Sequence, residues 1–549
     1  MRKALTTLLT ALTASVAASA ATVTGRITCE GAGVAGVPVS DGISIVVTDS
    51  LGRYSITGEM PYGTIFYTLP GGYEPETEDN GFQPKIFAHV DGDQDSTHDF
   101  ALSRVDNDSH LMVVGADSHL ARRLGDLEQF DSLFVGPVKE LVAANPGRKI
   151  YSTILGDLSW DQFWVRNEYG LPEFVTTMTE TGYPLMLFPV IGNHDNDPRI
   201  SAGDATDLLS SEPYRRTIAP SFYSFNLGKV HYVVLDDVVY RNDCTEGRSY
   251  KRGVAGNRNY ERRYTDDQLD WLRRDLALVA DKTAPLVIMF HVPAWRLNLS
   301  DTTFATRPNL ADGSSEALAE IVKDFDKVTL LSGHTHYNYH AHPEAYPNIR
   351  ENNVAAICAT WWWTGHLSDR HICVDGSPGG FALYDIDGKN VVSEYIGTDC
   401  AANNRFRVYD MNTVRDFYRT DEAARAMLEV ARNRTDYATI ADNTVYVNVF
   451  DYDTDWRIEI FEGDRPLAVR RIVAEDPLHT LAYDLPNFAL SGGVPGVFAS
   501  TPTSHIFEAV TDRADSPVTV RVTDGRGRTF TETIERPLAF DINLGIKQQ

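Results

Sequence analysis

The chain has little cysteine. Its five cysteines in 549 residues are Cys29, Cys244, Cys358, Cys373 and Cys400. None stands in a C-x-x-C arrangement, so the sequence does not indicate a cysteine-based zinc cluster. An odd number leaves at least one thiol outside any disulfide within the chain. Cys358 and Cys373 are the pair closest in sequence, and an oxidising compartment would permit them to pair.

Positive charge is also scarce. The chain has 50 Lys and Arg residues against 76 Asp and Glu residues, which gives a formal net charge of −26. Such a charge keeps a protein soluble and repels polyanions. We therefore expect no nucleic-acid partner, because a groove that follows phosphates would have to form against the field of the whole protein.

Long apolar runs are also absent. After the N-terminal segment, no stretch of the chain holds eighteen apolar residues in a row. The first twenty residues, MRKALTTLLTALTASVAASA, begin with Arg2 and Lys3, continue through an apolar segment and end in small residues. This order predicts a signal peptide over residues 1–20, cleaved before Ala21. A membrane anchor is the alternative, but the apolar segment is short and interrupted by threonines. We expect an exported protein, periplasmic or extracellular, with no stable membrane anchor.

The remaining chain divides into three regions, in keeping with its length. Residues 21–105 hold short strands separated by Gly, Asp and Ser, which predicts an N-terminal β-sandwich that resembles transthyretin-like domains. Residues 106–347 alternate apolar strands with helical patterns, which predicts a layered α/β domain. Residues 348–549 hold longer amphipathic strands and a helix near 421–432, which predicts a C-terminal mostly-β domain.

Polar side chains follow five apolar strands of the α/β region, HLMVVG, YSTILG, PLMLFPVIG, PLVIMF and KVTLLSG. The residues that follow them are Asp117 and His119, Asp157 and Asp161, Asn193 to Asp195, His291, and His334 and His336. The carboxyl edge of such sheets is where sites form. Carboxylates, imidazoles and an Asn carbonyl suit borderline divalent ions such as Zn, Fe, Mn or Co. This number of ligands fits two adjacent ions that share a carboxylate.

In chain order these motifs read D-x-H, G-D-x-x-x-D, G-N-H-D, H and G-H-x-H, and together they resemble the calcineurin-like metallophosphoesterases. The resemblance covers roughly residues 106–340, and the flanking regions are similar to the terminal domains of exported bacterial members. It implies two divalent metal ions. Asp117, His119 and His336 would bind the first ion, Asn193, His291 and His334 the second, and Asp157 both.

The same resemblance implies a reaction. A hydroxide that bridges the metals would attack phosphorus, His194 would protonate the leaving alkoxide as general acid, and Asp195 would orient the His194 ring. The expected activity is hydrolysis of phosphomonoesters or phosphodiesters, either small-molecule or surface-linked. Trp160 stands where purple acid phosphatases have a Tyr, which disfavours the tyrosinate-iron type.

Several alternatives stay open on the sequence alone. A nucleotide or nucleotide-sugar pyrophosphatase is one, because nothing in the sequence indicates which leaving group the protein recognises. A non-catalytic envelope binding protein is another, disfavoured because every ligand position and His194 are filled. His340 and His342 match no motif. The three consecutive tryptophans at 361–363 are either core residues or an aromatic wall over the metals. The oligomeric state is not indicated.

Overall fold

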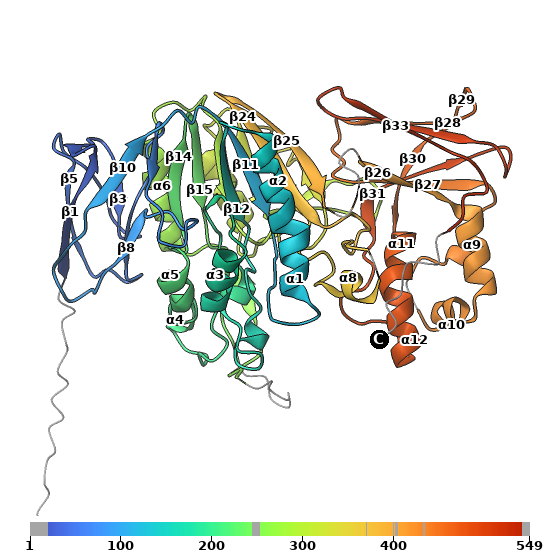
Figure 1. The fold of residues 1–549 in the computed structure, drawn as a ribbon, viewed down its shortest axis with the longest axis horizontal. Coiled ribbons are helices and arrows are strands. Elements are labelled where there is room, and N and C mark those ends of the chain that lie inside the picture. Colours follow the sequence, from blue (N-terminus) through green and yellow to red (C-terminus); the bar gives the residue numbers. More distant parts are fainter. Residues whose placement is uncertain are drawn as a thin grey trace, which may run out of the picture.

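In the computed structural model the chain forms three units in a row along the longest axis (Figure 1). The structure describes residues 20–243, 253–368, 370–398, 400, 404–431 and 434–540. The N-terminal β-sandwich lies at one end, the α/β unit in the middle and the C-terminal unit at the other end. Cys244 and the predicted signal peptide, except Ala20, lie outside the described residues. No helix in the described ranges is long and apolar enough to cross a membrane.

The predicted N-terminal β-sandwich is present as two sheets. Its strands alternate buried and exposed side chains, as in β5 (Arg53–Gly58), which buries Tyr54 and Ile56. One sheet orders β2 (Ala32–Gly33), β1 (Ala21–Cys29), β10 (Phe100–Arg104) and β7 (Tyr73–Pro75), with β5 and β9 (Ser96–Thr97) paired to β1; the other orders β4 (Ile45–Val47), β3 (Pro38–Ser40), β6 (Thr64–Tyr67) and β8 (Phe87–His89). The sandwich packs on the α/β unit, where Trp271 Nε1 donates to Ser40 Oγ at 3.1 Å.

Two sheets form the layered α/β unit that the sequence predicts. Short segments rich in Val, Ile and Leu build its parallel strands and are almost entirely buried. The first sheet orders β13 (Met186–Leu187), β12 (Lys149–Ile154), β11 (Ser109–Gly115), β24 (Gly380–Asp387) and β25 (Asn390–Gly397); the second orders β14 (Tyr223–Leu227), β15 (Val230–Val234), β18 (Leu286–Met289), β21 (Val328–Ser332), β23 (Ile349–Asn353) and β22 (Tyr339–Ala341). A 2.8 Å hydrogen bond between His110 of β11 and Tyr232 of β15 joins the two sheets.

Helices connect these strands and pack against them. α6 (Asp266–Ala277) begins after Thr265, whose hydroxyl accepts the amide hydrogen of Gln268, and it buries leucines at helical spacing. The turn between α1 and α2 places Phe134 against Phe381 of β24, with ring centroids 5.9 Å apart. The other helices are α1 (Asp126–Phe130), α2 (Gly136–Ala144), α3 (Leu171–Glu180), α4 (Thr206–Ser210), α5 (Glu212–Thr217), α7 (Ser314–Val322) and α8 (Trp363–Leu367); short ribbons pair β16 (Val238–Tyr240) with β17 (Tyr260–Arg262) and β19 (Trp295–Leu297) with β20 (Thr306–Pro308).

The α/β unit continues past the predicted boundary at residue 347. β23 pairs in parallel with β21, and β24 pairs antiparallel with β11 to complete the first sheet together with β25. β25 is an edge strand with mostly half-buried side chains. Antiparallel edge strands show the same alternation as the strands of the C-terminal unit, so the sequence pattern could not separate the two.

The C-terminal unit contains two four-stranded sheets and a group of helices. One sheet orders β26 (Phe406–Asp410), β27 (Thr444–Val449), β31 (Thr503–Val510) and β30 (Arg470–Ala474); the other orders β29 (Arg465–Pro466), β28 (Arg457–Glu462), β32 (Val518–Thr523) and β33 (Thr529–Ile534). The helix predicted near 421–432 is α10 (Glu422–Val430), and α9 (Met411–Thr420) precedes it. Asp410 and Asp421 cap these two helices through their side chains. α11 (Pro477–His479), a π-helical turn (Thr480–Asp484) and α12 (Leu485–Ser491) follow in one continuous run beside α8 (Figure 1).

Three cysteines in the described part of the chain, Cys29, Cys358 and Cys373, are buried free thiols. The pairing of Cys358 with Cys373 is therefore not formed. Both side chains pack in the core of the α/β unit, where a free cysteine behaves as a small apolar residue.

His340 and His342, which no motif explained, hold the C-terminal unit against the α/β unit. His340 Nε2 lies 2.7 Å from Asp451 Oδ1, and His342 Nε2 lies 2.6 Å from Asp453 Oδ1. Burial lowers the pKa of His340, but the carboxylates of Asp451 and Asp453 outweigh it and raise the pKa to about 9. His340 is therefore a charged contact between units rather than a ligand of the site described below.

This contact predicts a pH-dependent stability. Because the folded-state pKa of His340 lies above the ordinary value of 6.5, its stabilisation is complete below pH 6.5 and is lost as pH rises through about 9. We expect His340→Gln to lower the free energy of unfolding on the order of 3 kcal/mol at pH 6, and much less at pH 9.5. Urea unfolding at both pH values measures this, with the partly exposed His98→Gln as control. An equal deficit at both pH values would contradict the assignment.

Candidate metal centre

The predicted ligands come together where strands of both sheets end. β11 leads to Asp117 and β12 to Asp157 in the first sheet, while β18 leads to His291 and β21 to His334 in the second. Asn193 lies in a 3₁₀ turn (Asn193–Asp195) that follows β13 of the first sheet. Two layers thus contribute from opposite sides to one buried cluster.

The loops that carry the ligands have unusual backbone conformations. Left-handed φ angles between 43° and 68° occur at five of the predicted ligands: Asp117, His119, Asp157, His334 and His336. Such angles are rare for residues with a Cβ and are concentrated at functional sites. The motif glycines provide space: a Cβ at Gly192 would lie 2.3 Å from Asp157 Oδ1, and one at Gly333 would lie 2.7 Å from Asp117 Oδ2.

A first set of donor atoms gathers around His119. Its Nε2 lies 3.1 Å from His336 Nε2 and 3.4 Å from Asp157 Oδ2, and His336 Nε2 lies 3.3 Å from Asp117 Oδ1. All four side chains are at most 2% exposed. They are the residues predicted for the first ion, with Asp157 as the shared one.

A second set gathers around His291. Its Nε2 lies 3.0 Å from Asn193 Oδ1, 3.1 Å from His334 Nδ1 and 3.2 Å from Asp157 Oδ2. Asp157 Oδ2 is therefore common to both sets, while Asp157 Oδ1 accepts the amide hydrogen of His194 at 2.8 Å. The structure brings all seven predicted ligands together in two sets that share one carboxylate oxygen.

The chemistry of these sets fits divalent cations. Asp117 Oδ1 and His119 Nδ1 are buried and have no hydrogen-bond partner among the described residues, whereas buried polar atoms are almost always paired. His291 Nδ1 and His336 Nδ1 face the carbonyls of Leu155 and Ala359, so these nitrogens carry protons and both Nε2 lone pairs point into the cluster. Facing lone pairs and a carboxylate oxygen repel one another unless a proton or a metal cation lies between them, and nitrogen and oxygen donors of this kind are the ones that borderline divalent cations bind.

His194 lies beside the first set, but its partner is Asp161 and not Asp195. His194 Nδ1 lies 2.7 Å from Asp161 Oδ1, and Arg258 Nη1 lies 2.8 Å from the same oxygen. Burial lowers the pKa of His194, but the carboxylates of Asp157 and Asp161 outweigh it and raise the pKa above its ordinary value. The His194 side chain is 22% exposed, which leaves it accessible from outside the cluster.

The predicted orienting role of Asp195 is thus corrected. Its carboxylate accepts the backbone amides of Leu158, Ser159 and Gly192 at 2.9–3.2 Å, which ties the G-N-H-D turn to the loop after β12. Asp161 was visible in the sequence as the last residue of G-D-x-x-x-D. Arg258 carried no such signal, because it lies 97 residues further along the chain.

Aromatic rings border the first set. Trp361 stacks on His336, with centroids 3.7 Å apart and an interplanar angle of 15°, and Trp160 lies edge-on to His119 at 5.2 Å. Phe498, from the loop after α12, lies 4.2 Å from Trp361 and 6.0 Å from Trp160. These three residues are called the aromatic wall below. Trp362, by contrast, is buried and donates through Nε1 to Ser118 O, so it belongs to the core while Trp361 borders the site.

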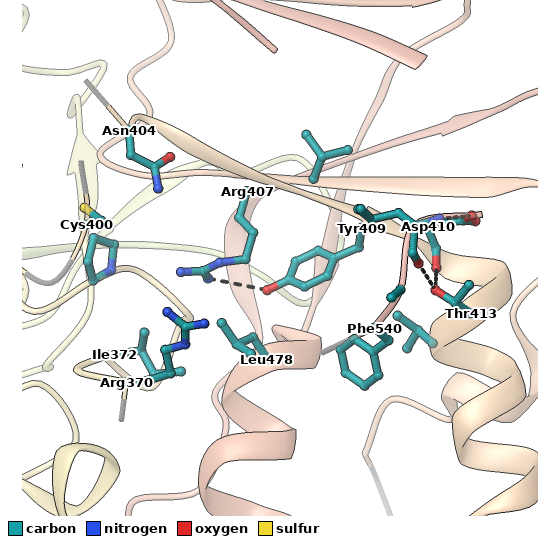
Figure 2. Close-up of a pocket in the computed structure, with 15 residues that line it drawn as sticks. Arg370, Ile372, Cys400, Asn404, Arg407, Tyr409, Asp410, Thr413, Leu478 and Phe540 are labelled. Carbon is teal, nitrogen blue, oxygen red and sulfur yellow. Dashed lines mark hydrogen bonds between the residues drawn. The ribbon is translucent and has the colours of Figure 1, made fainter. Parts of the chain in front are cut away.

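A separate pocket of about 360 Å³ lies where the segment around Arg370 and Ile372 meets the C-terminal unit (Figure 2). Arg370, Arg407, Tyr409 and Phe540 are among its lining residues. Arg407 is already engaged, since its Nη1 donates to Gly376 O at 2.7 Å and approaches Tyr409 Oη at 3.4 Å. None of the seven predicted ligands lines this pocket, so it is distinct from the metal centre.

Family models match the chain in three successive segments. Residues 21–105 match the N terminal of Calcineurin-like phosphoesterase, residues 107–338 match Calcineurin-like phosphoesterase, and residues 351–530 match the C terminal of Calcineurin-like phosphoesterase. The chain belongs to the calcineurin-like phosphoesterase family, with its N- and C-terminal domains. It is thereby a metal-dependent hydrolase of phosphoesters, and the resemblance found in the sequence is confirmed.

Two solved structures to which the chain is similar share little sequence identity with it. A dimetal phosphatase from Danio rerio is 15% identical and covers 53% of this chain and 96% of its own, with a TM-score of 0.33. A glycosyl hydrolase family 2 member from Bacteroides cellulosilyticus DSM 14838 is 8% identical and covers 91% of this chain and 74% of its own, with a TM-score of 0.16. No curated protein matches the sequence.

Proposed function

We propose that this protein is a dinuclear-metal phosphoesterase that hydrolyses phosphomonoesters or phosphodiesters, with His194 as the general acid. Asp117, His119 and His336 would hold one cation, Asn193, His291 and His334 the other, and Asp157 both. Two divalent cations bound there would supply Lewis-acid activation of a water molecule and of the phosphoryl oxygens. The observation that carries the proposal is the pair of donor sets that meet at Asp157 Oδ2.

The chain's own residues would move the proton. The contact with Asp161 occupies His194 Nδ1, so Nε2 is the nitrogen free to donate to a leaving oxygen. Its raised pKa keeps the ring protonated nearer to neutral pH, as a general acid requires. Arg258, on the other side of Asp161, donates to the same carboxylate oxygen at 2.8 Å and holds it in place.

The first experiment measures hydrolysis of p-nitrophenyl phosphate and bis-p-nitrophenyl phosphate by the purified protein, together with its metal content. We expect about two metals per chain, turnover of at least one ester, and loss of turnover after chelation with recovery on adding Zn, Mn, Fe or Co. The preferred ester would separate monoesterase from diesterase. A nucleotide or nucleotide-sugar pyrophosphatase would instead cleave a pyrophosphate bond in preference to both esters.

No metal after reconstitution and no turnover of any ester would overturn the proposal and favour the non-catalytic binding protein. The intact ligand set argues against that alternative, because a protein that only binds has no need of His194 held by Asp161 beside two donor sets.

We further propose that the protein is exported, on the strength of the signal-peptide pattern at residues 1–20. N-terminal sequencing of protein recovered from the periplasm or medium should begin at Ala21. Recovery of the uncleaved chain in the cytoplasm would refute export.

A further inference from the structure

The C-terminal unit contributes a side chain to the edge of the metal centre. Phe498 belongs to the segment between α12 and β31, more than 160 residues after the last predicted ligand. The segment is anchored on both sides of the ring: Tyr483 Oη donates to Val497 O at 3.3 Å, and Ser500 N donates to the Asp484 carboxylate at 3.3 Å. Phe498 is therefore held against Trp361 rather than projecting freely into solvent.

The aromatic wall lies beside the proposed general acid and the first donor set. Trp160 lies 5.9 Å from His194, centroid to centroid, and Trp361 lies against His336 of the first donor set. The proton donor and the wall thus lie on the same side of the cluster. A group bonded to an oxygen that His194 protonates would therefore lie near these rings.

Part of this surface is open. Trp361 and Phe498 are half-exposed, whereas Trp160 is buried behind them. The neighbouring Val497 is 66% exposed, which adds an apolar rim to the wall. Both Trp361 and Phe498 have left-handed backbone conformations, with φ angles of 49° and 62°. Conformations that a residue with a Cβ rarely adopts persist where the surrounding structure imposes them, and they concentrate at functional sites.

We propose that Trp361 and Phe498 form a stacking surface that selects phosphoesters whose leaving group presents a flat ring, such as an aryl or nucleobase group. The proposal rests on the phosphoesterase function and assigns the C-terminal unit a part in specificity. Contact between two aromatic rings, offset or edge-to-face, is more favourable than contact between an aromatic ring and an aliphatic group of similar size. A small aliphatic leaving group would leave the exposed parts of these rings in water.

The test separates ring recognition from hydrolysis by using non-hydrolysable phosphonates. Calorimetric titration of the metal-reconstituted protein with benzylphosphonate, hexylphosphonate and methylphosphonate measures binding at constant headgroup. We expect benzylphosphonate to bind about three- to tenfold more tightly than methylphosphonate. The affinity of hexylphosphonate should exceed that of methylphosphonate by a smaller factor. Phe498→Ala and Phe498→Leu should remove most of the benzyl preference and leave methylphosphonate binding unchanged.

Three results would overturn the inference. One is equal binding of benzylphosphonate and methylphosphonate to the unmodified protein. Another is a benzyl preference that survives in Phe498→Ala. The third is a hexyl preference as large as the benzyl preference and retained in Phe498→Leu, which would mean an apolar surface without ring selectivity. Failure of the proposed function looks different, since it would be absence of ester turnover, whatever the phosphonates bind.

Discussion

Replacing Asp157 with asparagine is expected to abolish activity, with a fall in kcat of about 10³-fold or more. Asp157 Oδ2 is the atom that both donor sets share, 3.4 Å from His119 Nε2 and 3.2 Å from His291 Nε2. An amide in its place is neutral, so the two sets would lose the charge that holds two cations close together. Inductively coupled plasma mass spectrometry should detect fewer than two metals per chain.

Asp385→Asn is the matched control for this variant. Asp385 lies on β24 in the same sheet and forms a half-exposed ion pair with Arg148, so its loss should leave metal content and kcat unchanged. Two metals per chain and an unchanged rate in Asp157→Asn would show that the cluster is not a shared-carboxylate centre.

His194→Ala should separate proton transfer from metal binding. We expect kcat to fall about 10²- to 10⁴-fold for an alkyl phosphate and far less for p-nitrophenyl phosphate, whose leaving phenolate needs no proton. The metal content should stay the same, because His194 is outside both predicted ligand sets.

Asp161→Asn tests the contact between His194 Nδ1 and Asp161 Oδ1, which the structure shows in place of the predicted contact with Asp195. The variant keeps an oxygen near His194 Nδ1 but loses the charge that favours the protonated ring, so the same dependence on leaving group should appear in weaker form.

An equal loss on alkyl and p-nitrophenyl esters in His194→Ala would mean that His194 serves in positioning and not as an acid.

The clustering of the seven predicted ligands could be foreseen from the sequence because each follows a short apolar segment, and such segments have few alternatives to a buried strand. Fixed spacing within a motif then places side chains such as His334 and His336 close together. The partner of His194 could not be predicted in the same way. Asp161 and Asp195 both lie within reach in sequence, and only the fold shows that three backbone amides already occupy Asp195.

The side chains that distant segments contribute to the site could not be predicted from the sequence. Arg258 and Phe498 stand in loops without a motif, and their positions depend on how the ribbons and the C-terminal unit pack. His340 and His342 stood out in composition, yet their carboxylate partners lie 111 residues away. Ion pairs of this kind depend on packing between units, which local spacing does not encode.

The order of strands in the first sheet also bears on how the protein can be made. β11, the strand that leads to Asp117, is paired on one side by β24, which the ribosome synthesises some 270 residues later. Until residue 387 has emerged, one edge of a buried, apolar strand has no partner, and an open edge of this kind invites pairing with other chains. A chain cut at residue 347 would keep all seven predicted ligands, and yet this edge of β11 would stay without its partner. The metal centre therefore cannot be separated from the rest of the protein at the point where its last motif ends.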